Sequence, residues 1–193
     1  RRLSVVRTEA GGESAPLRFR AFADTLRPGI VKIATTVEGQ EPYTEELSLA
    51  AGENQLEWTV VVPDPDLWWP WALGDQPRCA VTVAAFAEDG RVSHTVERRV
   101  GLRSLVFDDW QLSVNGERLF LKGANLAPTR ALLGEAGDDV VRRDIDLARE
   151  AGLDLVRVHA HITTPALYDQ ADERGMLVWQ DLPLQWGYAR SVR

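Results

Sequence analysis

The chain has 193 residues, of which 45% are hydrophobic, and a formal net charge of −7. This is enough to bury the core of one large domain or of two small ones. The negative charge argues against a nucleic-acid partner, and no apolar run is long enough to span a membrane. The single cysteine, Cys79, excludes an internal disulfide and favours a reducing, cytoplasmic location.

Residues 1–104 have the pattern of an all-β domain. Apolar and polar residues alternate in a series of segments, which predicts strands over 17–26, 29–39, 54–63, 78–90 and 92–101. Turn sequences rich in Gly, Pro, Asp and Asn separate these segments. We therefore predict an antiparallel β-sandwich of the immunoglobulin-like type.

From residue 105 the pattern becomes a mixture of strands and helices. Asn115-Gly116 lies between two alternating runs, which is a strong β-hairpin signal. The stretch "LFLKGAN" that follows predicts a strand ending at Asn125. Apolar residues then recur at helical spacing, which predicts a helix with Asp138 or Asp139 as its N-cap and Gly152 at its end.

A second strand and a second helix follow directly. The stretch "LDLVRVHA" (153–160) predicts the strand, and Thr164-Pro165 has the N-cap and N1 residues of a helix that ends at Gly175. The stretch "MLVWQDLP" (176–183) predicts a third strand. The order β-α-β-α-β implies parallel strands joined by helical crossovers.

All three of these strands end in polar residues, namely Asn125, then Arg157, His159 and His161, and finally Gln180 and Asp181. Arg157, His159 and His161 occupy every second position, so in a strand their side chains would share one face. Parallel α/β folds bind ligands beyond the carboxyl ends of their strands, so we expect these side chains to form a binding site. Trp179 alternates with Gln180 and is expected to face the helices.

Two α/β folds were compared with this pattern. A dinucleotide-binding fold lacks its Gly-x-Gly-x-x-Gly motif after the first strand. A TIM barrel fits the polar strand ends, but it needs eight βα units and about 250 residues. Residues 105–193 supply about three units, so we predict the N-terminal part of an incomplete (β/α)8 barrel.

Each candidate site residue also has a structural explanation. Arg157 could form an ion pair with a neighbouring strand carboxylate, and the histidines could be satisfied by hydrogen bonds. His-x-His could instead supply two metal ligands, although no third ligand is evident from the spacing. Trp186 and Tyr188, in the loop after the third strand, could stack on a sugar ring or simply pack. We expect the tryptophans of 68–71 to pack the sandwich against its neighbouring domain rather than to stack on a sugar.

Several segments together resemble glycoside hydrolase family 2, nearest its β-mannosidase-like branch. They are "LWWPWALGDQP", Gly101-Leu102-Arg103, "NGERLFLKGAN", "LVRVHAH" and "LYDQADERGMLVWQDLP", which occur in the family's order. The family joins an immunoglobulin-like domain to a (β/α)8 barrel, which implies the same arrangement here. The resemblance covers most of the chain from Leu67 onwards.

The chain departs from the family's pattern at four positions. Asp154 stands where the family has Asn, and Ala160 stands where many members have His. Leu126 and Arg130 replace a Trp and an Asp that β-mannosidases usually show. These departures leave the sugar open.

The resemblance implies a retaining exo-β-glycosidase that acts on a carbohydrate, and nothing in the sequence calls for a cofactor. Two glutamates would perform the chemistry, and the acid/base should follow an Asn. The chain contains no Asn-Glu dipeptide, so we expect both glutamates to lie beyond Arg193. Both ends of the sequence look cut, so we expect a fragment that contains no catalytic residue. Unpaired barrel strands would favour self-association. The alternative is a non-catalytic sandwich module that binds a carbohydrate or a protein.

Overall fold

The computed structural model describes residues 2–8 and 11–183, and its chain divides into two compact units. Unit 1 comprises Arg1–Leu67 and Pro77–Leu105, and unit 2 comprises Trp68–Gln76 and Val106–Arg193. The ranges predicted from sequence, 1–104 and 105–193, differ from these units chiefly in the segment Trp68–Gln76. This segment lies between two strands of unit 1 in sequence, Gly52–Pro63 and Cys79–Phe86, but packs within unit 2, for reasons given below.

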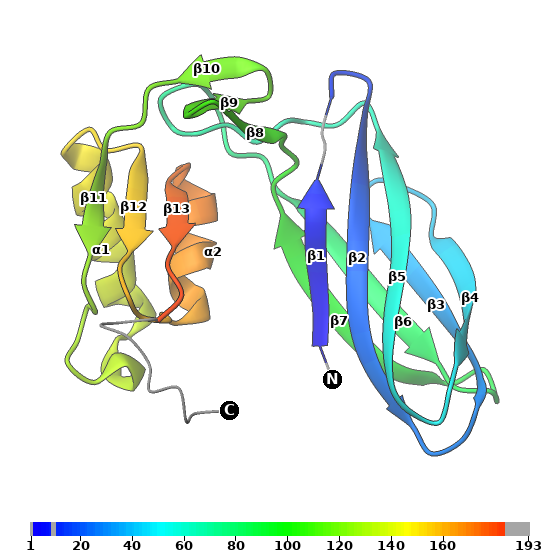
Figure 1. The fold of residues 1–193 in the computed structure, drawn as a ribbon. Coiled ribbons are helices and arrows are strands. Elements are labelled where there is room, and N and C mark those ends of the chain that lie inside the picture. Colours follow the sequence, from blue (N-terminus) through cyan, green and yellow to red (C-terminus); the bar gives the residue numbers. More distant parts are fainter. Residues whose placement is uncertain (1, 9–10, 184–193) are drawn as a thin grey trace. The chain divides into compact units, whose positions relative to one another are not determined.

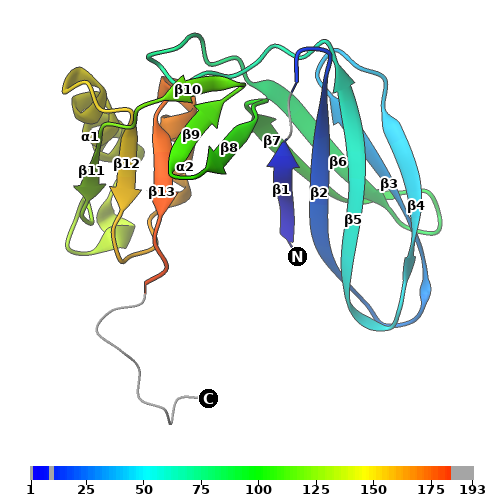
Figure 2. The same cartoon turned by 45° about the horizontal axis from the view of Figure 1, so that its top comes forward.

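Unit 1 consists of two antiparallel sheets (Figure 1, Figure 2). The first sheet has the order β1-β2-β5, built from Arg2–Thr8, Ser14–Thr25 and Gly52–Pro63. The second has the order β4-β3-β6-β7, built from Tyr43–Leu49, Gly29–Val37, Cys79–Phe86 and Val92–Val100. The five strands predicted from alternation are confirmed, and β1 and β4 are additional edge strands.

Alternating apolar residues of both sheets form one core between them. Leu17 and Phe19 of β2 and Trp58 of β5 are buried from the first sheet. Phe19 stacks on Trp58 with ring centroids 5.3 Å apart, and the indole Nε1 donates to Thr35 Oγ1 at 2.9 Å. This bond satisfies the one polar atom of the indole, so the ring can be buried without a desolvation penalty.

Unit 2 begins with a small sheet of order β10-β9-β8. Its strands are Leu105–Asp108 (β8), Gln111–Val114 (β9) and Glu117–Leu119 (β10). Asn115 and Gly116 connect β9 to β10, with φ of 51° and 87°. Two positive φ values are the requirement of a type I′ turn, so the predicted hairpin is confirmed.

The second sheet of unit 2 is parallel, in the order β11-β12-β13. Its strands are Gly123–Leu126, Leu155–Val158 and Leu177–Gln180, and the crossovers carry η1 (Leu133–Glu135), α1 (Asp138–Glu150) and α2 (Pro165–Arg174). Both α-helices lie against one face of this sheet (Figure 1). The predicted β-α-β-α-β order is confirmed.

The helix ends agree only partly with the prediction. Gly137 is the N-cap of α1, so the expected capping by Asp138 or Asp139 is wrong. Both carboxylates lie in the first turn, where the helix dipole still favours them. Thr164 precedes Pro165 at the start of α2, as predicted, and Gly175 ends this helix with a left-handed φ of 69°.

The segment Trp68–Gln76 packs at the helix side of unit 2. Trp68 is fully buried, and its Nε1 donates to the carbonyl of Asp172 in α2 at 2.7 Å. The side-chain amide of Asn115 donates to the Trp68 carbonyl at 3.0 Å. Contacts that span 104 residues of sequence therefore assign this tryptophan to unit 2.

Trp71 lies at the amino ends of the parallel strands. Its Nε1 donates to the carbonyl of Leu153, just before β12, at 2.8 Å, and its backbone N–H donates to Gly175, just before β13, at 3.0 Å. Lys122 and Arg149 lie 5.9 and 5.7 Å from the ring centroid, within cation–π range. The tryptophans thus anchor the end of the sheet opposite to the predicted binding site.

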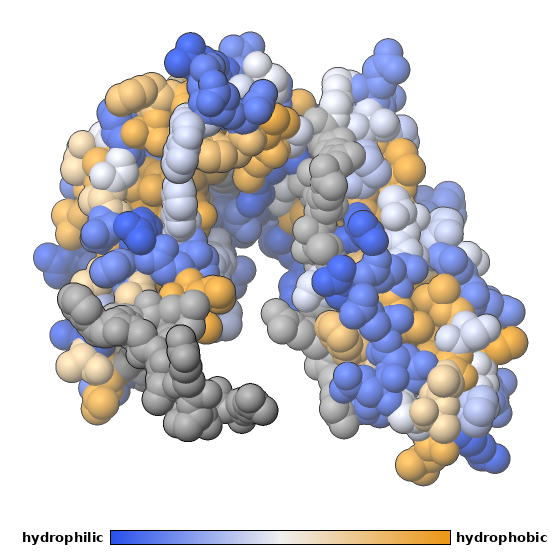
Figure 3. Space-filling view, viewed as in Figure 1, coloured by the Kyte–Doolittle hydropathy of each residue, from blue (hydrophilic) through white to orange (hydrophobic). Residues whose placement is uncertain are grey.

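Among the helices of residues 2–8 and 11–183, none combines the length and the apolar character needed to cross a bilayer. Figure 3 shows hydrophobic patches on the surface of both units, beside hydrophilic ones. In unit 2 the exposed hydrophobic residues include Trp110, Phe120, Trp179 and Leu182.

Candidate functional site

The candidate site lies where the three parallel strands end. Asn125, Arg157 and Trp179 are register partners across β11, β12 and β13, so their side chains share one face of the sheet. The neighbouring Val156 and Val158 of β12 are buried against α1 and α2 on the other face. The row of three therefore points away from the helices.

Trp179 was expected on the helix side, and this expectation is wrong. Its neighbour Val178 packs with the helix core, so the alternation along β13 turns the indole to the face of Arg157. Gln180 takes the helix side, where the Tyr168 hydroxyl of α2 donates to its side-chain carbonyl. The site thus gains a half-exposed indole that the sequence reasoning missed. Alternation from the apolar, partly buried Val178 would have located it.

Asp181 is the centre of the polar cluster. The Nε of Arg157 lies 3.0 and 3.1 Å from the two carboxylate oxygens of Asp181, and Nη2 lies 2.9 Å from Oδ2. His159 Nδ1 is 3.1 Å from the same Oδ2. The Asp181 side chain is 15% exposed, whereas Arg157 and His159 are 44% and 53% exposed. One shielded carboxylate therefore orients two side chains that remain open to a ligand.

Hydrogen bonds set the charge state of Asp181. The Arg157 guanidinium donates to its carboxylate and holds the pKa below the ordinary value. Partial burial acts against this shift, while His159 and the backbone N–H of Ala160 act with it. Asp181 is therefore a carboxylate at neutral pH and can only accept hydrogen bonds.

This charge state fixes the tautomer of His159. Because Asp181 only accepts, the Nδ1 of His159 must carry the proton of their bond. In the neutral imidazole, Nε2 then has a free lone pair and can accept a hydrogen bond. The cluster thus presents one acceptor at His159, and the exposed Asn125 amide and the ring of Trp179 lie on either side of Arg157 in the same row.

The strand ends earlier than predicted, and this places the histidines. β12 stops at Val158, so His159 and His161 lie in the loop beyond it and do not continue the face of Arg157 by alternation. Ala160 has a left-handed φ of 59°, which turns the chain between them. The Nδ1 of His161 lies 3.0 Å from the carbonyl oxygen of His159, and Gln180 Nε2 donates to the His161 carbonyl at 2.7 Å. This loop is thereby tied to β13.

Asp154 lies at the opposite end of β12. Its carboxylate is fully buried and accepts from the Lys122 backbone N–H at 3.2 Å, with Lys122 Nζ at 3.3 Å. The other carboxylate oxygen, Oδ1, has no hydrogen-bond partner among the described residues. The departure from the family's Asn at this position is therefore remote from the candidate site.

Two further expectations concern residues around the site. Trp186, and Tyr188 with it, lie outside the described residues. The alternative that His159 and His161 bind a metal needs a third ligand, and the described residues do not supply one. Within residues 2–8 and 11–183, no group of three or more His, Cys, Asp or Glu side chains could hold a metal ion.

Comparison with known proteins gave no matching family model. Among curated relatives, β-mannosidase A of Aspergillus niger is 23% identical over 197 residues, which cover 88% of this chain and 21% of that protein. An exo-β-D-glucosaminidase of Hypocrea jecorina is 28% identical over 176 residues, covering 85% of this chain and 19% of that protein. The chain therefore spans about a fifth of the length of these curated relatives.

Solved structures agree with these relatives. A β-D-mannosidase from Dictyoglomus thermophilum has a TM-score of 0.78 at 24% identity, covering 94% of this chain and 24% of that chain. An exo-chitosanase from Amycolatopsis orientalis has a TM-score of 0.76 at 25% identity, covering 93% and 22%. A family 2 glycosyl hydrolase from Bacteroides cellulosilyticus has a TM-score of 0.79 at 20% identity, covering 97% and 25%. The relatives of this chain thus include β-mannosidases and exo-β-D-glucosaminidases, and its fold is similar to that of a family 2 glycosyl hydrolase, which supports the resemblance seen in the sequence.

Proposed function

We propose that the polar cluster at the ends of β11, β12 and β13 binds the sugar of a retaining exo-β-glycosidase. The observation that carries this proposal is the Arg157–Asp181–His159 cluster at the carboxyl end of a parallel strand. Ligands of parallel α/β folds bind at this end of the sheet. The relatives of the chain are glycoside hydrolases, which makes a glycoside the matching ligand.

The proposed setting of the site is a (β/α)8 barrel in the whole protein, following an immunoglobulin-like sandwich. Unit 2 has parallel neighbouring strands and crossover helices on one face, as a barrel requires. Within the described residues, β11 and β13 each leave one edge unpaired, where further barrel strands would add. Unit 1 has the antiparallel sheets and shared core of a sandwich, which supports the other half of this proposal.

Each site residue has a proposed role in this setting. The Nε2 of His159 accepts a hydrogen bond from a sugar hydroxyl, and the Asn125 amide provides a donor and an acceptor. The exposed indole of Trp179 offers a face for stacking on the sugar ring. Arg157 holds Asp181 and thereby positions His159, so we propose a positioning role for it. His161 and Gln180 hold the loop through their mutual bond.

The bond cleavage itself needs two carboxyl groups about 5–5.5 Å apart. Asp181 is the carboxylate at the described strand ends, and its oxygens are occupied by Arg157 and His159. We therefore place both catalytic glutamates in parts of the whole protein outside these residues. On this proposal the chain supplies binding and orientation but does not hydrolyse glycosides by itself.

The proposal is tested by assaying aryl β-glycosides with the full-length gene product and with this chain in parallel. The panel should contain the mannoside, glucosaminide, galactoside and glucuronide. Hydrolysis by the full-length protein alone is the expected result, and the preferred glycoside identifies the sugar. A full-length protein that hydrolyses none of them would overturn the proposal. Hydrolysis by this chain would show that the catalytic carboxylates had been misplaced.

A further inference from the structure

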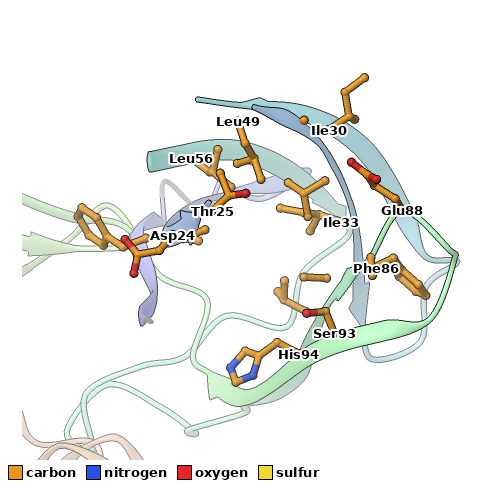
Figure 4. Close-up of a pocket in the computed structure, with 18 of the residues that line it drawn as sticks. Asp24, Thr25, Ile30, Ile33, Leu49, Leu56, Phe86, Glu88, Ser93 and His94 are labelled. Carbon is orange, nitrogen blue, oxygen red and sulfur yellow. The ribbon is translucent and has the colours of Figure 1, made fainter. Parts of the chain in front are cut away.

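Unit 1 contains a cleft between its two sheets that the proposed function does not use. It has a volume of about 890 Å³ and lies where β2 ends, β3 begins and β6 turns into β7 (Figure 4). Side chains of both sheets line it, among them Leu56 of β5 and Ile33 of β3, which Figure 4 labels. This volume is in the range of small-molecule sites, about 300–1,000 Å³.

The cleft results from small residues at core positions. The inward face of β2 carries Leu17 and Phe19, both fully buried, and then continues with Ala21 and Ala23. On β6 the same face changes from buried Val83 to Ala85. Large side chains therefore fill one end of the sandwich, whereas methyl groups leave the other end hollow.

The floor of the cleft is hydrocarbon. Ile33, Leu56 and Val83 are buried core residues that also line it. The ring of Trp58 lies beneath, but it is 4% exposed and already stacked on Phe19. A sugar would find its hydroxyl groups against aliphatic carbon here, without an open indole face for stacking. The floor suits an apolar ligand body.

One wall of the cleft carries an arginine and a histidine. His94 and Arg98 of β7 are register partners of Ala85 and Val81, so they share the core-facing side of this sheet. Arg98 donates to the neighbouring carbonyl of Glu97 at 2.8 Å, and no ion pair joins it to a carboxylate among the described residues. A guanidinium and an imidazole thus face the cleft at positions where a sandwich normally has apolar residues.

Three acidic residues also line the cleft, but they leave this wall available. Asp89 is paired with Arg91 at 2.7 Å, and Asp24 has a polar or charged partner of its own. Glu88 lies next to Gly29, and Figure 4 shows it on the opposite side of the cleft from His94. The charge that an entering ligand meets along β7 is therefore positive.

We propose that this cleft binds a small amphipathic carboxylate, such as a medium-chain fatty acid. Its apolar body lies on the aliphatic floor, and its carboxylate accepts hydrogen bonds from Arg98 and His94. Charge-assisted bonds of this kind give the site its preference for an anion over a neutral ligand of the same shape. The cleft is lined by residues of unit 1 alone, and the proposal does not depend on the proposed glycosidase activity.

The test uses octanoate and 1-octanol as probes, titrated into the 193-residue chain and followed by NMR chemical shifts and calorimetry. Octanoate should saturate a single site, shift the resonances of Ala85 and His94, and bind about tenfold more tightly than 1-octanol. In Arg98→Gln this preference should disappear. Ala85→Leu should fill the cleft and abolish binding of both probes, whereas Ala84→Leu, on the outward face of the same strand, should not.

Several results would overturn the proposal. They are the absence of saturable octanoate binding, equal affinity for the two probes in the unmodified chain, and a preference that survives in Arg98→Gln. Binding of a neutral sugar such as methyl β-glucoside at Ala85 and His94 would do the same. If Ala85→Leu does not fold, as its amide spectrum would show, Ala23→Leu on the other sheet provides the same occlusion, and Arg98→Gln still decides the matter.

Discussion

Replacing Trp68 by alanine tests whether the segment Trp68–Gln76 stabilises unit 2. The side chain is fully buried, and its Nε1 donates to the Asp172 carbonyl at 2.7 Å. Truncating a buried tryptophan leaves a cavity and costs about 3–5 kcal/mol. The lost hydrogen bond leaves a carbonyl without this donor, which is a further destabilising contribution. This is a large fraction of the about 5–15 kcal/mol that stabilises an ordinary domain.

Hydrogen exchange followed by mass spectrometry locates the effect. In Trp68→Ala we expect the amides of α2 and β13 to lose protection, while those of β2 and β5 keep theirs. Trp110→Ala is the matched control, because Trp110 also belongs to unit 2 but is 84% exposed. Its exchange should remain close to that of the unmodified chain. Trp68→Phe retains most of the apolar volume and should lie between the two.

The reasoning would be refuted by loss of protection in β2 and β5 with α2 unchanged. That result would place Trp68 with the first sheet of unit 1. Equal effects of Trp68→Ala and Trp110→Ala would also refute it, because burial would then not explain the difference.

Four further predictions follow from the geometry of unit 2. Gly175→Ala should lower the free energy of unfolding by at least about 1–2 kcal/mol, which urea denaturation measures, because φ is +69° and the added Cβ would overlap the backbone nitrogen of Trp71. Asp181→Asn should shift the His159 proton towards Nε2, which long-range ¹H–¹⁵N NMR detects. In the unmodified chain, the pKa of Asp181 lies below its usual value of 3.8. The contacts of Asp181 with Arg157 and His159 should therefore be intact above pH 3.8 and be lost only as the pH falls through the lower pKa of the folded state. Within residues 2–8 and 11–183, β11 and β13 each have one unpaired edge, which should promote self-association, and a concentration-independent monomer in sedimentation would contradict this.

The sequence was most informative where hydrophobic periodicity was strong. The long strands β2, β3, β5 and β6 alternate clearly because one face is buried, and they were predicted close to their observed bounds. β4 was missed because it is an edge strand with weak periodic contrast: the polar, partly buried Glu45 lies on the same face as Leu47 and Leu49, while Glu46 on the other face is exposed. The place of Trp68 depends on a partner 104 residues away, which no local pattern encodes.

The sequence predicted at which edge of the parallel sheet the site residues lie, but not which of them contact one another. Because parallel strands end together, Asn125, Arg157 and Asp181 were expected at one edge, and the structure places them there. The convergence of His159 on Asp181 depends on β12 ending at Val158 and on the left-handed turn at Ala160. Strand alternation cannot foresee such a turn, since a non-glycine residue rarely adopts this conformation.

The most direct test of the central claim compares kcat/KM of the full-length protein and of its Arg157 variants for the preferred aryl β-glycoside. Arg157→Met and Arg157→Lys both remove the fork that holds Asp181, and each should lower kcat/KM by about 100-fold, as misplaced site residues do. Arg142→Met, on the exposed side of α1, should leave it unchanged and serves as the control. Arg157 variants that fold normally and keep the activity of the unmodified enzyme would contradict the claim that this cluster positions the sugar.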